Sequence, residues 1–461
     1  MTMSHPIIEQ LGASLPGMRL LTDVAAMEPF RRDETRYVRP GEPLAVAFPR
    51  STAEVSAIVR LASRHGVPLV PRGAGTGLSG GAIATQGAIS VVMTQMDRIL
   101  EISAVDLLVV TQPGVINADL GDAVAAEGLF YPPDPASYET CSMGGNLAEN
   151  SGGLRCVKYG ITGDYVLGLE VVLADGEVIR TGGRNAKDVM GYDLSHLFIG
   201  SEGSLGIITE ATLRLLRQPA PKLTLLSFFD AVRPAGDAVA RMTSAGLVPV
   251  TLELMDGFTI RAVETTLHLG LDVDAEAMLM IESDAGGAAA EAELDSAEDA
   301  CRQAGARSLV RSTDTTDADR LRDARRLAHW ALEQAGVARM EDIGVPRSRI
   351  ADLLAAIEHE SHRHGLRVGV FGHAGDGNFH PTFVMDRRDP DAESRIDALR
   401  ADLFAAVLAM GGTISGEHGT GVVKRAWLAA QRGDRAVAAM RAIKQALDPQ
   451  GIFNPGKVLP D

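Results

Sequence analysis

The sequence predicts an α+β protein of two or three domains, and three observations support this. The chain has 461 residues, more than one hydrophobic core usually organises. Its first half alternates helix-like and strand-like segments. Its second half combines β-like runs with long helical segments rich in Ala, Leu and Arg, a pattern typical of a sheet covered by helices.

The first half is expected to begin its α/β alternation at a capped helix. Ser51 and Glu54 form a capping box ahead of an amphipathic run from Val55 to Arg64, which predicts a helix that ends at Gly66. Three strands and a second helix are expected next, at Val67–Val70, Ala88–Met93, Leu107–Thr111 and Asn117–Glu127. An Asp-Gly pair between two β-rich runs then predicts a hairpin from Glu170 to Thr181.

Two prolines at 219 and 221 predict a domain boundary, because they interrupt what looks like the end of a strand. Beyond them we expect strands at Thr251–Met255, Ala277–Glu282 and Arg367–Phe371, and helices at Glu291–Gln303, Arg320–Glu333 and Arg349–His364. The closing segments Ile443–Leu447 and Ile452–Lys457 read as short and turn-rich. The predicted organisation is an N-terminal segment (1–41), a first domain (42–219), a second domain (220–411) and a C-terminal segment (412–461).

Charge and cysteine content exclude several classes of protein. Asp and Glu (60) outnumber Lys and Arg (44), and the net charge of −16 opposes binding to nucleic acid. The cysteines, Cys141, Cys156 and Cys301, fit neither a disulfide framework nor an iron–sulfur cluster. No apolar run approaches the roughly 18–20 residues that span a bilayer, and the N-terminus lacks a signal-peptide pattern. We expect a cytoplasmic protein that does not span a membrane, with peripheral attachment to the inner face of the membrane left open.

A literal G-x-G-x-x-G motif runs from Gly75 to Gly80 after a predicted strand, which raises the possibility of a nicotinamide-binding Rossmann turn. That interpretation fails because the Rossmann turn opens a helix, whereas residues 81–94 continue with glycine, small residues and another strand. A glycine loop of this kind can instead present consecutive backbone N–H groups to an anion such as a diphosphate.

Two more glycine clusters follow, Thr140–Gly153 and Tyr159–Asp164, the first preceded by Pro132–Ser137. Three such clusters within about 90 residues, each mixed with Ser, Thr or Asn, suggest backbone wrapped around one long polar ligand.

The glycine clusters resemble those of the vanillyl-alcohol-oxidase type of FAD-binding protein. The motifs that carry the likeness are Pro71–Thr76, Gly144–Asn146, Ser151–Gly153, Val166–Gly176 and Gly200–Thr209, and together they span nearly all of residues 42–218. The resemblance implies a two-part α/β FAD-binding domain, a substrate (cap) domain with an antiparallel sheet covered by helices, and a C-terminal segment that completes the site and packs on the flavin domain.

The same resemblance implies which residues hold FAD, with the diphosphate on residues 72–77. The implied set is Pro71, Arg72, Gly73, Ala74, Gly75, Thr76, Gly77, Asp134, Ser137, Thr140, Gly144, Gly145, Asn150, Ser151, Gly153, Gly160, Asp164, Ile207 and Asn454.

A second candidate site lies in the other half of the chain. His373 and His380 form an H-x6-H pattern in a glycine-rich loop, and Glu417 with His418 follows in a second one. Two imidazoles and a carboxylate suit a divalent zinc, iron or manganese ion with positions left open for substrate. The histidines at 359, 362 and 364 are instead expected on a solvated helix face.

These histidine loops, and the closing Phe453–Lys457, resemble the FAD-linked 2-hydroxyacid dehydrogenases, a group with D-lactate dehydrogenases, D-2-hydroxyglutarate dehydrogenases and the flavin subunit of glycolate oxidase. The resemblance implies a metal on His373, His380 and Glu417, with His418 as the catalytic base. It also implies that Asn378 orients the substrate and that Arg325, or else Arg326, binds its carboxylate.

The resemblance implies oxidation of a small anionic 2-hydroxy acid by hydride transfer to flavin N5. Pro381 is more like glycolate oxidase, and Met340 stands where the hydroxyglutarate enzymes carry Lys, so glycolate or lactate is favoured over a long dicarboxylate. Electrons would pass to a separate acceptor: an iron–sulfur subunit, an electron-transfer flavoprotein, a quinone or oxygen. The alternatives are an FAD-containing lyase or transferase of the alkylglycerone-phosphate synthase type, and a non-catalytic flavin subunit of a larger complex.

Overall fold

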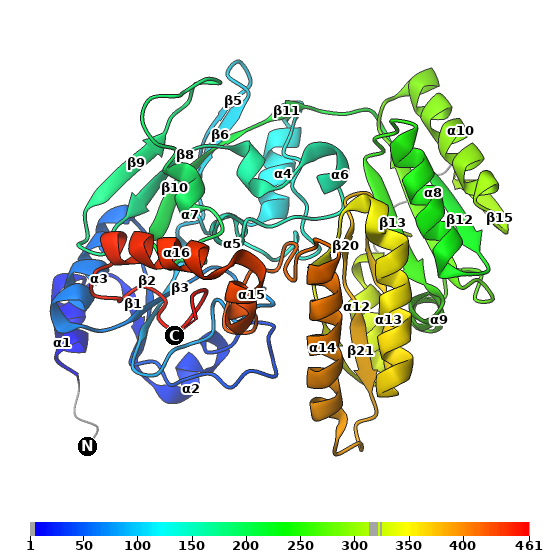
Figure 1. Cartoon of the computed structure of the whole chain (residues 1–461). Coiled ribbons are helices and arrows are strands. Elements are labelled where there is room, and N and C mark those ends of the chain that lie inside the picture. Colours follow the sequence, from blue (N-terminus) through cyan, green and yellow to red (C-terminus); the bar gives the residue numbers. More distant parts are fainter. Residues whose placement is uncertain (1–4, 313–320, 323–324, 461) are drawn as a thin grey trace. The chain divides into compact units, whose positions relative to one another are not determined.

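The computed structural model describes residues 5–312, 321–322 and 325–460. It divides into two compact units, each assembled from separate stretches of chain (Figure 1). The first unit comprises residues 1–152, 161–218 and 417–461, and the second comprises 153–160 and 219–416. The four segments expected from the sequence remain a prediction about domain organisation.

The first unit contains a mixed four-stranded sheet. Its strand order is β1 (Arg19–Leu21), β2 (Ala45–Phe48), β4 (Ile89–Val92) and β3 (Leu69–Arg72). Strands β2 and β3 run parallel to β4, and β1 runs antiparallel to β2. Every residue of β2 and β4 is buried, which explains why both strands are apolar except for Ser90. Helices α1 (Pro6–Ser14) and α3 (Thr52–His65) contribute Ile7, Leu11, Val55 and Ile58 to the same core.

Helix α3 confirms the expected start and stop signals. The Ser51 side chain accepts a hydrogen bond from Glu54 N at 3.3 Å, and Gly66 ends the helix in the left-handed region at φ +62°. One detail of the capping box differs, because Glu54 accepts its hydrogen bond from Arg50 N at 2.7 Å rather than from the N-cap residue.

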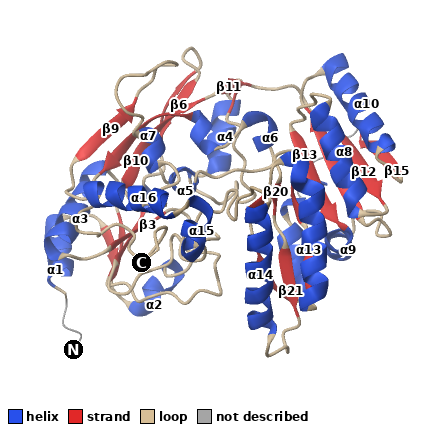
Figure 2. Ribbon diagram, viewed as in Figure 1, coloured by secondary structure: helices blue, strands red, loops and turns tan. Residues whose placement is uncertain are grey.

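A five-stranded antiparallel sheet completes the first unit (Figure 2). Its order is β5 (Ile99–Ser103), β6 (Leu108–Thr111), β10 (Ile207–Arg214), β8 (Val166–Val172) and β9 (Val178–Gly182). The β8–β9 pair is the expected hairpin, and Gly176 takes a positive φ of 82° in its turn. Strands β7 (Leu129–Phe130) and β11 (Leu216–Arg217) pair separately. The other helices and 3-10 turns of the unit are α2 (Val24–Met27), η1 (Glu28–Phe30), η2 (Met93–Gln95), α4 (Asn117–Ala125), α5 (Met143–Glu149), η3 (Thr162–Tyr165), α7 (Ser195–Phe198), η5 (Arg425–Trp427), α15 (Leu428–Arg432) and α16 (Asp434–Leu447).

No helix opens directly after the first glycine loop, as the sequence predicted: β3 ends at Arg72 and the next regular element is strand β4. The closing segment is different from the expectation. Residues 434–447 form the 14-residue helix α16 rather than a short turn-rich piece, and Val437 is its buried residue.

The second unit is an antiparallel sheet covered by helices, as expected. The seven strands lie in the order β15 (Ser308–Ser312), β12 (Leu223–Phe229), β14 (Ala277–Ser283), β13 (Thr251–Asp256), β19 (Phe371–His373), β20 (Asn378–Phe379) and β17 (Ile343–Gly344). A smaller sheet holds β16 (Val337–Met340), β21 (Thr382–Met385) and β18 (Arg367–Gly369). The helices and 3-10 turn whose bounds lie within the described residues of the unit are α6 (Cys156–Tyr159), α8 (Val232–Ser244), α9 (Gly257–Leu267), α10 (Gly287–Gln303), α12 (Ala328–Gln334), η4 (Arg347–Arg349), α13 (Ile350–His364) and α14 (Ala392–Ala409).

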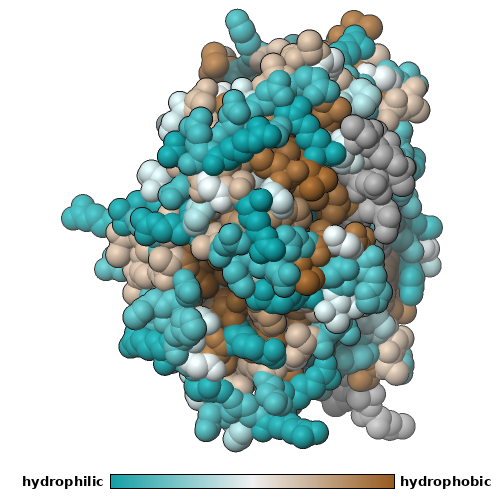
Figure 3. All heavy atoms as spheres, turned by 90° about the vertical axis from the view of Figure 1, so that its right-hand side faces the viewer, coloured by the Kyte–Doolittle hydropathy of each residue, from teal (hydrophilic) through white to brown (hydrophobic). Residues whose placement is uncertain are grey.

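Helix α10 shows why these helices cover the sheet. Its buried residues Ala290, Leu294, Ala297, Ala300 and Cys301 recur at spacings of three and four, which places them on one face. The side of the molecule that is on the right in Figure 1 is accordingly mostly hydrophilic, with smaller hydrophobic patches between (Figure 3).

One expectation for the second unit needs correction. The single strand expected at Arg367–Phe371 is split, because β18 pairs with β21 whereas β19 pairs with β13 and β20. The helix expected at Arg320–Glu333 falls partly outside the described residues, and α12 covers its C-terminal part. Among the residues that the structure describes, no helix combines the length and apolar character that crossing a bilayer requires.

Candidate active site

Two buried histidines face each other in the second unit. His373 ends strand β19 and His380 directly follows β20, its hairpin partner. Their ring centroids are 5.2 Å apart and the ring planes meet at 86°. Glycine is required in the connecting loop, because a Cβ on Gly377 would lie 2.2 Å from the Val345 carbonyl oxygen and φ there is +87°.

A glutamate that the sequence analysis did not single out holds the first histidine. Glu253 on β13 lies directly opposite His373 in the sheet register, and its Oε1 is 2.7 Å from His373 Nδ1. With Nδ1 donating to this carboxylate, the lone pair of His373 is on Nε2, the arrangement found behind metal-ligating histidines.

The other oxygen of Glu253 pairs with the predicted substrate-binding arginine. Arg325 Nη2 is 2.7 Å from Glu253 Oε2, an ion pair without the alignment of a hydrogen bond. The guanidinium also stacks over the Phe371 ring, 4.7 Å from its centroid, and the side chain is 4% exposed. Arg326, the alternative choice, is half-buried.

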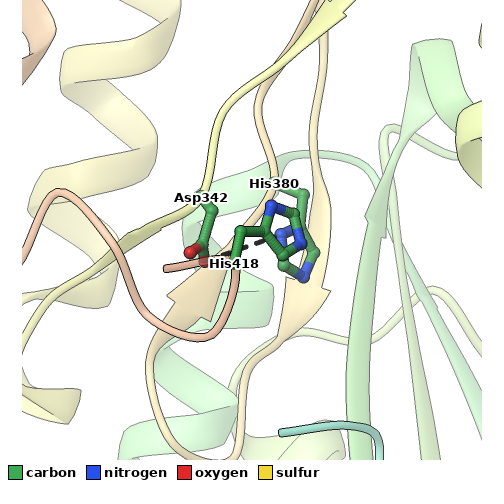
Figure 4. A group of neighbouring side chains, drawn as sticks. All are labelled: Asp342, His380 and His418. Atoms are coloured by element: carbon green, nitrogen blue, oxygen red, sulfur yellow. Dashed lines mark ion pairs between the residues drawn. The ribbon is translucent and has the colours of Figure 1, made fainter. Parts of the chain in front are cut away.

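The second histidine also has a carboxylate beside it. Asp342 is fully buried, and its Oδ1 is 3.9 Å from His380 Nδ1 (Figure 4). Asn378 Nδ2 donates to the same oxygen at 2.7 Å and to the Ile343 carbonyl at 3.1 Å. Ser415 Oγ donates to Asp342 Oδ2 at 3.2 Å. Asp342 therefore contacts three side chains of the candidate site, and it was not predicted from the sequence. The amide nitrogen of Asn378, which was expected to orient the substrate, donates its hydrogen bond to Asp342 instead.

Glu417 and His418 lie in the first unit, where they line a cavity together with the glycine loop. The His418 Nε2 and Glu417 Oε1 atoms are 3.8 Å apart. The loop that follows is fixed by Glu202, which accepts hydrogen bonds from Thr420 N at 2.6 Å and from Gly421 N at 2.8 Å.

Many of the residues predicted to hold FAD line this cavity or a neighbouring one in the same unit. Those in the first cavity are Gly73, Ala74, Gly75, Thr76, Gly77, Ser137, Gly145 and Ser151. Those in the second are Pro71, Arg72, Gly73, Gly144, Gly145 and Ile207. Glu149, which the sequence analysis passed over, lines both.

The other predicted residues lie outside these two cavities, and the contacts of several are structural. Asn150 accepts from Gly163 N at 2.8 Å, Asp164 accepts from Ile161 N at 2.8 Å, and Asn454 donates to the Gly81 and Glu202 carbonyls. The remaining ones are Asp134, Thr140, Gly153 and Gly160, of which the two glycines belong to the second unit.

The cavities fit a large polar ligand. The backbone approaches closely because a Cβ on Gly73 would lie 2.3 Å from Ser142 Oγ. Asn146 Nδ2 and Glu149 Oε2 are buried without a hydrogen-bond partner, although both residues line the first cavity. Orphaned polar atoms of this kind are rare in native proteins, and a cofactor bound in the cavity would supply partners for them.

Several ionisable groups are buried behind the glycine loop. Burial raises the pKa of Glu149 well above its usual range, and raises that of Glu202 to about 7. Burial also lowers the pKa of Lys457 to about 7, although Asp33 and both glutamates oppose this. The ammonium of Lys457 donates to the Gly81 and Ile83 carbonyls at 2.8 and 2.6 Å.

One histidine expected on a solvated helix face is not solvated. His364 is half-buried, and its Nε2 is 2.9 Å from Asp402 on the neighbouring helix α14, so that expectation was wrong for His364. His359 and His362 are exposed as expected.

Comparisons with known proteins agree with this architecture. Residues 43–182 match the FAD binding domain family, and residues 218–458 match the family "FAD linked oxidases, C-terminal domain". The chain is 44% identical to glycolate oxidase subunit GlcD of Bacillus subtilis over 90% of this chain and 89% of that protein. It is 35% identical to a probable mitochondrial D-lactate dehydrogenase of Danio rerio over 94% of this chain and 88% of that protein.

Among solved structures, p-cresol methylhydroxylase superposes with a TM-score of 0.81 at 17% identity, over 99% of this chain and 96% of that one. This likeness confirms the predicted vanillyl-alcohol-oxidase type of fold. The matches over both halves confirm the FAD-binding character predicted from the glycine clusters, and the chain belongs to the family of FAD-linked oxidases.

Proposed function

We propose that this protein oxidises a small 2-hydroxycarboxylate, glycolate or D-lactate, to the corresponding 2-oxo acid. The observation that carries the proposal is the buried pair of imidazoles whose Nδ1 sides face carboxylates, with Arg325 held on one of those carboxylates. The names of relatives with 44% and 35% identity, a glycolate oxidase subunit and a D-lactate dehydrogenase, support the substrate class.

The donor set suits a divalent metal. We propose that His373, His380 and Glu417 hold it, because imidazole and carboxylate donors suit zinc, manganese or iron. Covalent reach supports the third ligand: Ser415 is hydrogen-bonded to Asp342, and Glu417 follows two residues later, so its Cα lies within about 7.6 Å of that of Ser415. FAD when bound supplies the hydride acceptor, and the metal when bound lowers the pKa of the substrate hydroxyl.

The chain's own residues supply binding and proton transfer. Arg325 still has N–H donors beyond its contact with Glu253, and these bind the substrate carboxylate. His418 takes the hydroxyl proton as general base. Residues 71–77, 144–145 and 151 hold the cofactor through backbone N–H groups and small side chains.

The electrons leave through a separate acceptor. No disulfide joins the three cysteines in the described part of the chain, and their spacing does not fit an iron–sulfur cluster. The word "subunit" in the name of the Bacillus subtilis relative favours a partner protein over oxygen. We propose a cytoplasmic location for the assembly.

Anaerobic reduction of the purified yellow protein tests the proposal. Glycolate and D-lactate should bleach the flavin absorbance, L-lactate and D-2-hydroxyglutarate should do so more slowly, and His418→Ala should retain FAD but lose the bleaching. Failure of every 2-hydroxy acid to reduce the flavin would refute the proposed function. Full-speed reduction of His418→Ala would refute the role of the base.

A further inference from the structure

We infer that Glu253 is a positioning residue, which fixes the metal ligand His373 and the substrate-binding Arg325 with the two oxygens of one carboxylate. This inference rests on the proposed function and deepens it. It makes metal binding and substrate binding depend on a single side chain that touches neither ligand.

The location of Glu253 is the first argument. It lies in the middle of β13, between the apolar residues Leu252 and Leu254, and is 2% exposed. A carboxylate in such a place is costly unless it is paired and hydrogen-bonded. Its two nearest partners are side chains that the proposed function already assigns to the reaction.

The contact with His373 is set by the sheet itself. Glu253 and His373 are directly opposite in the β13–β19 pairing, so their side chains project from the same face. The 2.7 Å contact from Nδ1 fixes both the tautomer and the rotation of the imidazole, which directs the Nε2 lone pair away from the strand. At His380 the contact with Asp342 is longer, 3.9 Å from Nδ1, and Asp342 also accepts a hydrogen bond from Asn378.

The contact with Arg325 holds the guanidinium from a second direction. Phe371 supports one face of the planar group, while Glu253 Oε2 restrains Nη2 at its edge. A guanidinium fixed in this way presents its remaining N–H groups in one orientation, which a bidentate contact with a substrate carboxylate requires.

The test uses full-length, FAD-containing protein and zinc ion as the metal probe. Glu253→Gln keeps the size of the side chain but loses the charge that faces His373 and Arg325. Zinc affinity should fall about 10- to 100-fold, the usual effect of removing a carboxylate behind a metal-bound histidine. The KM for the hydroxy acid should rise as well, while FAD content stays the same.

Glu282→Gln is the matched control. Glu282 is a fully buried carboxylate on the adjacent strand β14, where Arg322 and Lys222 pair with it at 2.6 and 3.3 Å. This variant should lower the unfolding temperature yet leave zinc affinity and KM at the wild-type values. If Glu253→Gln does not fold, Glu253→Asp replaces it, because the retained charge is withdrawn by one methylene and should still weaken zinc binding.

Zinc affinity of a folded Glu253 variant within twofold of wild type would overturn the inference, and so would an equal loss in Glu282→Gln. A wild-type protein that binds zinc but whose flavin no hydroxy acid reduces would refute the proposed function, and the zinc affinities would still decide the role of Glu253. A wild-type protein that is reduced but binds no zinc would overturn the inference and leave the oxidation standing.

Discussion

Glu202→Gln should remove part of the pH dependence of stability. Glu202 is buried behind the loop that follows His418, where its carboxylate accepts hydrogen bonds from Thr420 N and Gly421 N. It belongs to a crowded acidic group, because a Cβ on Gly419 would lie 2.1 Å from Glu149 Oε2 and 3.0 Å from Glu202 Oε1. Burial raises the pKa of Glu202 from 4.5 to about 7, and the two backbone hydrogen bonds oppose this rise.

The sign and size of the effect follow from that pKa. Between pH 4.5 and 7 the folded protein keeps a proton on Glu202 that the unfolded chain has lost, so stability falls as pH rises through this window. At 1.36 kcal/mol per pH unit, the wild type loses on the order of 3 kcal/mol of unfolding free energy from this group. Glutamine cannot titrate, and it retains an oxygen that accepts hydrogen bonds from the same backbone groups. The unfolding free energy of the variant should therefore fall by less over the same pH range.

Unfolding temperatures at pH 5 and pH 7.5, measured by differential scanning fluorimetry, give the required comparison. The decline between the two pH values should be several degrees smaller for Glu202→Gln than for wild type, at roughly 2 °C per kcal/mol. Glu177→Gln is the control, because its carboxylate is 69% exposed, and it should follow the wild type. Equal declines for all three proteins would show that the burial of Glu202 does not govern its protonation.

Three further outcomes are expected. Gly144→Ala should reduce the FAD content and cost roughly 1–3 kcal/mol of stability, because its Cβ would lie 2.6 Å from the Pro113 Cβ. The ratio of flavin to protein absorbance measures the FAD content, and Gly121→Ala, with open space around it, is the control. Ser51→Ala should cost about 1 kcal/mol through loss of the N-cap of α3, measured as a lower unfolding temperature with unchanged FAD content. Treatment with a chelator should slow anaerobic flavin reduction and leave FAD bound, and added zinc or manganese should restore the rate; a rate unaffected by metal removal would contradict the proposed metal site.

The elements that the sequence predicted well are those with local signals. Helix α3 has an N-cap serine at one end and a glycine in the left-handed region at the other, and both signals lie within the helix's own neighbourhood. Helix α16 lacks them: no side chain caps its first turn, which follows Gly433, and Val437 is its buried residue. A helix with so narrow an apolar face leaves a weak periodic pattern.

The residues of the candidate site likewise differ in whether a local sequence signal could predict them. The two histidines of the H-x6-H pattern lie on one hairpin, so their spacing already indicates that they face a common point. Glu253 meets His373 across 120 residues, and Glu202 meets Gly421 across 219, pairings that only the assembled sheet and loop create. A single Glu within an apolar strand does predict a buried charge that needs a partner. One sequence cannot identify that partner. The histidines and the arginine could therefore be predicted from the sequence, whereas the carboxylates that position them could not.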